Sequence, residues 1–239
     1  MITDPRKILI TFQFWDGDKA QMMKVARFLA NVEPAMSDLA DIAFVCRNDS
    51  SQCRDTVEYV SKKFHVHTVK SRRTEVGWPA GCAGLFFGTA DWIYEHKVAK
   101  RIPDYKAFLI MEADAAPLVP DWIAKLSSAW DAANVKVLGA LQTGLVHING
   151  NALYSGDMKF LKRVSREIAG CAPQGGYDYL LHPEWVRQGM ADCPLMKSWW
   201  HHPGLDKATY DRLVEEGVVF LHGIKNDSVM EQHRLRFPH

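Results

Sequence analysis

The sequence predicts an α/β protein built on a mostly parallel β-sheet. Strand-like and helix-like segments alternate over about the first 140 residues, which is typical of a parallel sheet covered by helices. The segment 106–111 (KAFLIM) is almost continuously apolar, as expected for a central strand that is buried on both faces. Apolar residues make up 47 % and charged residues 24 % of the 239 residues, so the chain can form one large core.

Three strand and helix units open the chain. Each begins with a β-rich apolar or alternating segment and continues with a segment whose apolar residues recur at a helical period. The turn Asn48-Asp49-Ser50-Ser51 supplies N-cap residues for the second helix. The three pairs are 7–14 with 18–31, 41–47 with 52–64, and 65–70 with 83–97.

The second half of the chain is less regular. After the strand at 106–111, Pro120 stands where a helix accepts proline, in its first turn. No repeat or linker marks a domain boundary. We therefore expect a single domain over 1–239, with one half at about 1–142 and the other at about 143–239. The further elements expected are a strand at 135–141, a basic helix at 155–168, a loop at 170–176, a partly helical stretch at 177–187 and a last strand at 218–222.

Charge and cysteine content exclude several classes of protein. With 29 Lys+Arg against 28 Asp+Glu the net charge is +1, so no field of the whole molecule favours nucleic acid or a membrane surface. The chain begins without the apolar stretch of a secretory signal and has no run of about 18 apolar residues. We expect a cytoplasmic protein without membrane insertion. Five cysteines at irregular spacing, without a CxxC, favour reduced and mostly buried thiols.

Two acidic residues directly follow the most apolar strand. In Glu112-Ala113-Asp114 the carboxylates are two residues apart, so on extended backbone they point to the same side. Ligands of parallel sheets bind beyond the carboxyl ends of the strands. The pair therefore predicts a site of hard oxygen ligands suited to Mg²⁺ or Mn²⁺. The alternative is a solvated turn or a pair of helix-capping acids.

A histidine leaves the last expected strand in a similar way. His222 is followed by Gly223, which permits a close backbone approach, and by Lys225, a point charge suited to phosphate. Read alone, His222 is a hydrogen-bonded histidine of the core or of a turn. Read together with Glu112 and Asp114, it is a candidate third metal ligand.

These motifs resemble those of the GT-A fold glycosyltransferases, which use nucleotide sugars. Glu112-Ala113-Asp114 looks like an ExD variant of the DxD motif that closes a central strand in that family, and residues 222–225 (HGIK) are similar to its C-terminal histidine motif. The resemblance implies a Rossmann-type three-layer sandwich with a smaller, irregular C-terminal part on the acceptor side. It also implies Mn²⁺ or Mg²⁺ held by Asp114, Glu112 and His222, with Lys225 on the diphosphate and Glu112 near the ribose.

The same resemblance assigns further residues to the donor. The segment after the second strand would contact the nucleobase, the loop 72–81 the nucleotide and its diphosphate, and the segment 147–154 the sugar. A solvated basic turn and an ordinary Asn-Gly turn are the respective alternatives for the last two segments. The donor residues are Arg47 and Asp49, Arg73 and Gly77, Ala113 with Glu112, Asn149, Gly150 and Asn151, and Lys225.

Asp178 and a tryptophan pair are assigned to the acceptor side. Asp178 follows Gly175 and Gly176 in the order in which the family places its acceptor-side acid, which makes it the candidate general base; a helix N-cap is the alternative. A base opposite the leaving nucleotide implies inversion at the sugar, whereas an acid that only orients the sugar implies retention. Trp199 and Trp200 offer rings that stack on a sugar or a base.

The leading hypothesis is a metal-dependent glycosyltransferase with a UDP-sugar as the default donor. The chain resembles compact bacterial or phage-type members, some of which glycosylate modified bases in DNA, so a hydroxymethylated base in phage DNA is a candidate acceptor. The alternatives are a non-catalytic nucleotide-sugar-binding module of the same fold and a metal-dependent phosphohydrolase. The basic residues that would form a local phosphate-binding patch, or else the solvated face of a helix, are Lys159, Lys162, Arg163, Arg166, Arg234 and Arg236.

Overall fold

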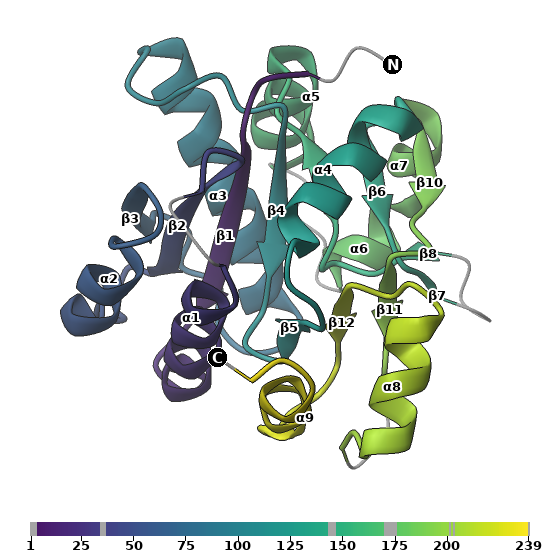
Figure 1. Cartoon of the computed structure of the whole chain (residues 1–239). Helices are drawn as coiled ribbons and strands as arrows, with labels where there is room; N and C mark the ends of the chain where they lie inside the picture. The colour runs from purple at the N-terminus through teal and green to yellow at the C-terminus, as the bar shows by residue number, and fades with distance from the viewer. Residues whose placement is uncertain are drawn as a thin grey trace.

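A seven-stranded sheet forms the centre of the protein (Figure 1). The computed structural model describes residues 4–33, 37–142, 147–169, 176–200, 202 and 204–238. The strands of this sheet are β1 (Ile8–Phe14), β2 (Ala40–Arg47), β3 (Val66–Ser71), β4 (Ala107–Met111), β6 (Val137–Gly139), β9 (Leu153–Ser155) and β10 (Met190–Asp192). Their order is β10-β6-β9-β4-β1-β2-β3. Only β9 runs antiparallel to its neighbours, so the prediction of a mostly parallel sheet is confirmed.

Helices cover both faces of the sheet. Side chains alternate along a strand, so Ile8, Ile10 and Phe12 of β1 enter one apolar core while Leu9 enters the other. The first core is covered by α1 (Lys19–Val32), α2 (Arg54–Val60) and α4 (Trp122–Ala133). The second is covered by α3 (Ala80–Val98), α5 (Met158–Lys162), the π-helical segment η1 (Arg163–Ile168), α6 (Tyr177–Leu180) and α7 (His182–Gln188). The three layers expected from the sequence are therefore present.

The C-terminal part is smaller, as expected, and contains a second sheet that the sequence pattern did not indicate. In this sheet β12 (Phe220–His222) pairs with β11 (Met196–Ser198) and with β5 (Ala115–Pro117). Helices α8 (Lys207–Glu215) and α9 (Ser228–Arg236) complete this part and contribute to the first core. A short antiparallel pair, β7 (Leu141–Gln142) with β8 (His147–Ile148), lies between β6 and β9 in the sequence. The expected last strand at 218–222 is thus real, but it belongs to the small sheet.

One predicted boundary is wrong for a clear reason. The helix expected at 155–168 begins only at Met158, because the preceding residues form β9 between β4 and β6. Asp157 caps the helix, since its Oδ1 accepts a hydrogen bond from Phe160 N at 2.8 Å. The loop expected at 170–176 lies, except for Gly176, outside the described residues.

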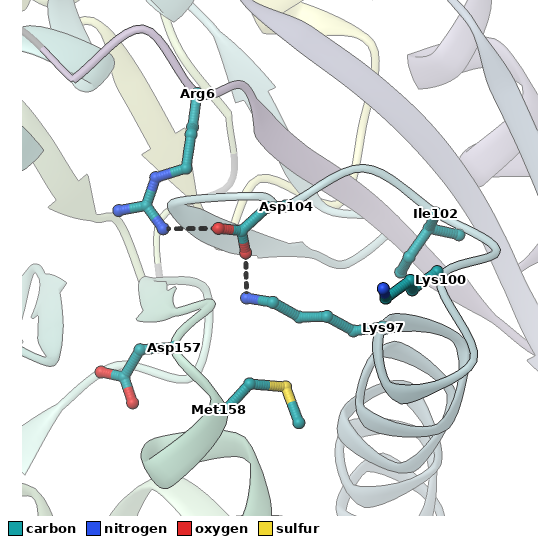
Figure 2. Close-up of a pocket in the computed structure, with 7 residues that line it drawn as sticks. All are labelled: Arg6, Lys97, Lys100, Ile102, Asp104, Asp157 and Met158. Atoms are coloured by element: carbon teal, nitrogen blue, oxygen red, sulfur yellow. Dashed lines mark hydrogen bonds and ion pairs between the residues drawn. The ribbon is translucent and has the colours of Figure 1, made fainter.

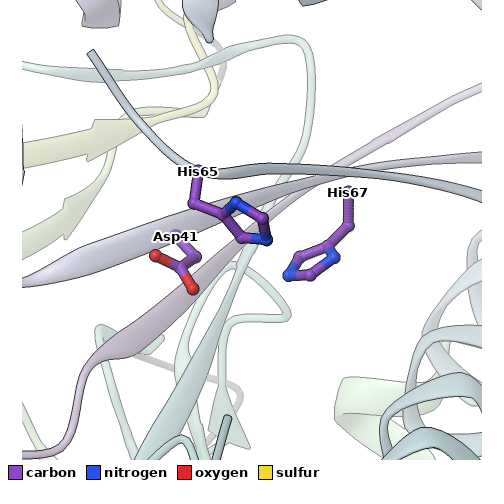
Figure 3. Close-up of side chains that lie close together, drawn as sticks. All are labelled: Asp41, His65 and His67. Atoms are coloured by element: carbon purple, nitrogen blue, oxygen red, sulfur yellow. The ribbon is translucent and has the colours of Figure 1, made fainter. Parts of the chain in front are cut away.

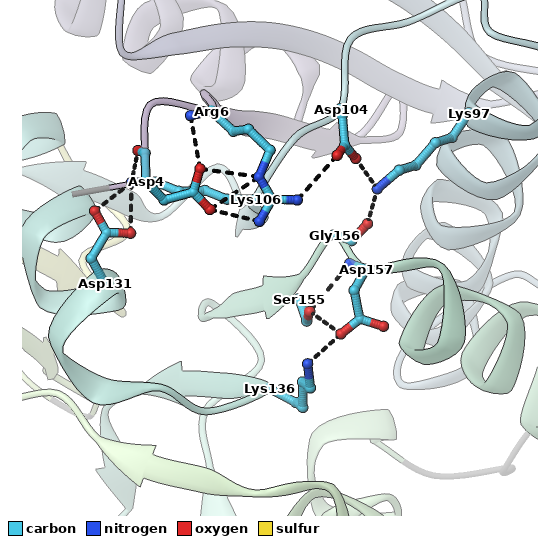
Figure 4. Close-up of polar contacts among 10 residues, drawn as sticks. All are labelled: Asp4, Arg6, Lys97, Asp104, Lys106, Asp131, Lys136, Ser155, Gly156 and Asp157. Carbon is cyan, nitrogen blue, oxygen red and sulfur yellow. Dashed lines mark hydrogen bonds and ion pairs between the residues drawn. The ribbon is translucent and has the colours of Figure 1, made fainter. Parts of the chain in front are cut away.

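Ion pairs join the segments at the amino ends of the parallel strands (Figure 4). The ammonium of Lys106, a residue whose side chain is 2 % exposed, lies 2.8 Å from Asp131 of α4 and donates to Asp4 O at 3.2 Å. Arg6 pairs with Asp104 at 3.1 Å. These contacts fix the segments that enter β1 and β4. Among the described helices, none is both long and apolar enough to cross a membrane.

Candidate active site and metal centre

Strand pairing brings Glu112, Asp114 and His222 together. The two acids follow the end of β4, and the chain continues into β5, which runs antiparallel to β12. In this register His222 lies opposite Ala115, so Asp114 is level with the end of β12. The backbone confirms the docking, because Gly223 N donates a hydrogen bond to Asp114 O at 3.0 Å.

One imidazole nitrogen faces both carboxylates. His222 Nε2 lies 3.1 Å from Asp114 Oδ1 and 3.3 Å from Glu112 Oε2. The side chains of His222, Asp114 and Glu112 are 4 %, 16 % and 30 % exposed. Neither contact has the alignment of a hydrogen bond, and the other ring nitrogen, Nδ1, has no hydrogen-bond partner among the described residues. The three groups thus converge without satisfying one another.

The carboxylates and the imidazole shift one another's pKa. Burial alone would lower the pKa of His222, but the adjacent Asp114 and Glu112 raise it to about 9. Burial alone would raise the pKa of Asp114, but the contact with His222 and the charge of Lys225 lower it overall. The site therefore stabilises positive charge between its carboxylates.

Two residues that were not predicted, Asp18 and Cys82, lie close enough to the carboxylates of the cluster for their pKa values to be shifted. Burial, together with the negative charges of Glu112 and Asp114, raises the pKa of Asp18 to about 6. Burial and the neighbouring Glu112 raise the pKa of the Cys82 thiol to about 12. Asp18 follows β1 and Cys82 lies in the first turn of α3. The position of Asp18 after the first strand, at the edge where ligand sites collect, is the signal that the sequence offers for it.

An asparagine on the loop before β9 holds Glu112 in place. Asn151 Nδ2 donates to Glu112 Oε2 at 2.8 Å, and Glu112 N donates to Asn151 Oδ1 at 2.8 Å. Asn149 Oδ1 in turn accepts from Asn151 N at 2.9 Å. Both asparagines are buried. Both residues lie in the turn between β8 and β9, which was the alternative, and the Asn151 amide also reaches Glu112.

Asp178 reaches the same loop from α6. Its Oδ2 accepts a hydrogen bond from Gly150 N at 3.2 Å and lies 3.6 Å from His147 Nε2, a residue the sequence analysis did not single out. The Asp178 side chain is 23 % exposed. The helix begins after Gly176, and no side chain caps it, so Asp178 is not an N-cap. Its carboxylate therefore stands beside the loop that carries Asn149 and Asn151.

Trp200 lies against the cluster formed by Glu112, Asp114 and His222. The Trp200 ring meets the His222 ring edge-on, with centroids 4.7 Å apart, and Lys225 Nζ lies 5.9 Å from the centre of the Trp200 ring. Trp199 N donates to His222 O. Gly223 has a φ of +102°, and a Cβ there would lie 3.2 Å from the Trp199 carbonyl carbon, so glycine is required where β12 ends. Trp200 therefore screens one side of His222.

The residues assigned to the nucleobase gather at the ends of β1 and β2. Arg47 forms an ion pair with Asp49, and its guanidinium lies 5.9 Å from the centre of the Trp15 ring. Trp15 is 50 % exposed. Trp15 was not among the predicted residues, although it directly follows the first strand. An exposed indole at that position is a flat apolar surface for a ligand.

Arg73 is held by the protein itself. Its guanidinium lies 3.1 Å from Asp91 Oδ2 on α3 and 5.8 Å from the centre of the Phe87 ring. Gly77, in the same loop, has a φ of +73° and open space where a side chain would be. Donor binding by Arg73 stays a prediction, and it requires the arginine to share or leave Asp91.

Three of the six basic residues proposed as a phosphate-binding patch form ion pairs. Arg163 pairs with Glu184 at 3.0 Å, and Arg166 pairs with Glu95 at 3.0 Å. Arg236 pairs with Asp211 of α8. This arrangement is that of solvated helix faces, which was the alternative reading of the same residues.

One surface hollow lies away from this cluster. It has a volume of about 500 Å³ and is lined at the amino ends of the strands by residues that include Arg6, Lys97 and Lys100 (Figure 2). Arg6 and Lys97 both pair with Asp104 there. None of Glu112, Asp114 and His222 is among the residues that line this hollow.

Comparison with known proteins decides the fold. No sequence-defined family matches the chain, and a search of curated proteins finds no match. The structure resembles the glycosyltransferase GlyE of Streptococcus pneumoniae TIGR4, with a TM-score of 0.58 and 11 % identity, over 93 % of this chain and 56 % of GlyE. This chain has the GT-A glycosyltransferase fold. It spans just over half the length of GlyE.

Two further GT-A structures are similar. A glycosyltransferase involved in the glycosylation of the major capsid of PBCV-1 matches with a TM-score of 0.53 and 14 % identity, over 96 % of this chain and 98 % of that one. TarS of S. aureus matches with a TM-score of 0.55 and 9 % identity, over 96 % of this chain and 38 % of TarS. A GT-A protein of this length thus has a counterpart among solved structures.

The cluster of this GT-A protein fits a divalent cation. One ligand atom from each of Glu112, Asp114 and His222 lies within 4.8 Å of the other two. Two carboxylates and one imidazole form a donor set that Mn²⁺ accepts. The buried His222 nitrogens without aligned hydrogen bonds are what a site for an added ligand requires.

Proposed function

We propose that this chain is a metal-dependent glycosyltransferase that moves a sugar from a nucleotide sugar to an acceptor hydroxyl. The observation that carries the proposal is the convergence of Glu112, Asp114 and His222 at the carboxyl end of β4. This is the edge at which an α/β sheet binds its ligands. The GT-A fold supports a glycosyltransferase reaction, and the ligand cluster supports metal dependence.

The residues of the cluster have separate tasks. Asp114, Glu112 and His222 would hold Mn²⁺ or Mg²⁺, and the mixed oxygen and nitrogen set favours Mn²⁺. A divalent ion bound there supplies positive charge to the departing nucleoside diphosphate. Asn151 fixes the Glu112 carboxylate through two hydrogen bonds, and Lys225 adds a cation where negative charge develops.

The proposed donor is a UDP-sugar. TarS has been solved in complex with UDP and with UDP-GlcNAc, which supports a uridine nucleotide as the first donor to test. In this chain Arg47, Asp49 and Trp15 would receive the nucleobase. The exposed Trp15 ring offers a stacking surface, and the Arg47–Asp49 pair offers hydrogen-bonding groups.

Asp178 is the proposed general base. The acceptor oxygen forms a bond to the anomeric carbon while the bond from that carbon to the diphosphate oxygen breaks. The electron pair of the broken bond leaves with the nucleoside diphosphate, and the acceptor proton passes to the Asp178 carboxylate. If Asp178 instead only orients the sugar, the reaction retains configuration, and donor affinity depends on this side chain.

The acceptor is proposed as a hydroxyl, with a hydroxymethylated base in DNA as one class to test. Three of the six cations proposed for contact with DNA, Arg163, Arg166 and Arg236, are committed to ion pairs, which weakens the support for a DNA acceptor. Binding of DNA would then depend weakly on salt. A sugar, peptide or small-molecule hydroxyl needs no basic surface.

The test is a panel of nucleoside diphosphates and UDP-sugars with Mn²⁺ and, separately, with EDTA. Ligands that bind the folded protein raise its Tm. We expect one nucleotide to raise Tm only with Mn²⁺, and we expect release of that nucleotide from its sugar donor. Binding without any release, over a range of acceptors, would favour a non-catalytic module. Release of phosphate from nucleotides without sugar would favour a phosphohydrolase, and no shift with any nucleotide would contradict the proposal.

A further inference from the structure

A second group of potential metal ligands lies at the amino ends of β2 and β3. Asp41 stands near the start of β2, and His65 and His67 flank the first residue of β3 (Figure 3). Because Ile42 pairs with Val66 in parallel register, Asp41 is level with His65. Residues two apart in a strand point to the same side, so both imidazoles face the side that carries the Asp41 carboxylate.

The three side chains are close enough to share one ion. A ligand atom of each lies within 4.8 Å of the other two. The two imidazole rings meet at 85° with centroids 4.7 Å apart. Asp41 is buried, at 1 % exposure, whereas His65 is exposed. The group therefore has an anchored acid on the inside and an accessible imidazole on the outside, which leaves a path for an ion from solvent.

Hydrogen bonds orient the acid from behind. The Tyr105 hydroxyl donates to Asp41 Oδ2 at 2.7 Å, and Lys7 Nζ donates to Asp41 Oδ1 at 2.9 Å. The same hydroxyl oxygen lies 3.0 Å from His67 Nε2. Since its proton is used by Asp41, it accepts from His67 Nε2–H, and Nδ1 of the neutral ring then keeps its lone pair. Such outer partners are what hold metal-binding carboxylates and imidazoles in place.

We propose that Asp41, His65 and His67 form a zinc site, separate from the active-site cluster, that ties the edge strand β3 to β2. Two imidazoles and one carboxylate are a known zinc donor set, with a water in the fourth position. Donor atoms on one zinc lie roughly 3.4 Å apart, given bonds of about 2.0–2.2 Å. The exposed His65 therefore moves inward on binding, and the ion takes over the role that Lys7 plays at Asp41.

The first test is a calorimetric zinc titration of the full chain carrying Asp114→Asn, which disables the other cluster. His65→Asn in that background removes the exposed ligand without opening the core. We expect it to lose one zinc equivalent or to bind at least tenfold more weakly, and to lose the zinc-induced rise in Tm. His182→Asn, which changes a histidine on α7, is the matched control and keeps both. Equal zinc binding by His65→Asn and its parent overturns the site.

A second variant tests Asp41 without touching the ligands. Lys7→Met removes the cation that now pairs with Asp41, so zinc binding should tighten severalfold and the zinc-induced rise in Tm should increase. Unchanged or weaker zinc binding in Lys7→Met contradicts a role for Asp41. Both readouts are binding and stability, so they do not depend on glycosyl transfer.

Discussion

Asp114 and His222 are joined both through their side chains and through the backbone beside them. His222 Nε2 lies 3.1 Å from Asp114 Oδ1, and Gly223 N donates to Asp114 O at 3.0 Å. The two residues belong to opposite halves of the chain and meet because β12 pairs with β5. The cluster of Glu112, Asp114 and His222 therefore exists only when β12 is docked against β5.

Asp114→Asn should abolish the Mn²⁺-dependent rise in Tm that a donor nucleotide produces. The amide is nearly the same size as the carboxylate but carries no charge for the ion, so we expect at least a tenfold loss of Mn²⁺ affinity. EDTA should have the same effect on the unchanged protein. Asp121→Asn is the matched control, because Asp121 is exposed with a φ of 60° that asparagine tolerates. Donor binding that persists in Asp114→Asn would refute the ligand assignment.

The pKa of His222 predicts opposite pH responses with and without metal. Without metal, the folded pKa of about 9 lies above the usual histidine pKa of 6.5. The resulting stabilisation is full below pH 6.5 and is lost as pH rises through about 9, and it is on the order of 3 kcal/mol. Metal binding instead requires the neutral imidazole, so Mn²⁺ affinity should increase with pH over the same range.

Urea unfolding in EDTA at several pH values checks the metal-free response. The difference in the free energy of unfolding between the parent and His222→Gln should shrink from pH 6.5 to pH 9.5, since glutamine does not titrate. A difference that stays constant with pH would show that the imidazole carries no extra charge in the folded protein.

Asn151→Ala should weaken the metal site without removing a ligand. The amide exchanges two hydrogen bonds with Glu112, so its loss frees the carboxylate and leaves a backbone N–H unpaired. We expect roughly a 10- to 100-fold loss of Mn²⁺ affinity and a destabilisation of about 1–3 kcal/mol. Calorimetry with Mn²⁺ and urea unfolding measure the two effects. Unaltered Mn²⁺ affinity would mean that Asn151 serves only the turn.

Local sequence patterns predicted five strands of the central sheet but not β9 or β10, and only β12 of the small sheet. The apolar run 106–111 identifies β4 because a strand buried on both faces must be apolar throughout. Strands β5 and β11 have three residues each, too few to display a period. Their pairing partner β12 lies far along the chain, so their existence depends on tertiary contacts that no local pattern records.

Local sequence patterns likewise predicted only some residues of the candidate site. Glu112, Asp114 and His222 were predicted because each leaves an apolar strand at the edge where ligands bind. Asp18 and Trp15 also follow a strand, yet their residue types alone did not separate them from an ordinary surface turn. The ion pair of Arg73 with Asp91 depends on how α3 packs, and an isolated arginine in a glycine-containing loop gives no sign of it.

Asp131→Asn should destabilise the protein strongly. It removes the charge opposite the Lys106 ammonium, which is 2 % exposed, and an uncompensated buried charge typically costs about 3–5 kcal/mol. Asp55→Asn, which breaks the exposed pair with Arg27, should leave the urea midpoint nearly unchanged. Equal effects of the two substitutions would mean that water reaches Lys106.

Asp178→Asn separates the two roles proposed for this acid. Asparagine can still accept the hydrogen bond from Gly150 N, so the loop should keep its shape and the Tm should change little. If Asp178 is the base, donor affinity is unchanged while nucleotide release falls by about 10²- to 10⁴-fold. If it orients the donor sugar, affinity for the nucleotide sugar falls and affinity for the free nucleoside diphosphate does not.

Asp192→Asn is the matched control, because Asp192 Oδ1 also accepts from a backbone N–H, that of Leu141, at 2.8 Å. If Asp178→Asn has the same turnover and the same two affinities as Asp192→Asn, Asp178 takes no part in the reaction. The search for a base would then move to Asp18, whose pKa is raised to about 6.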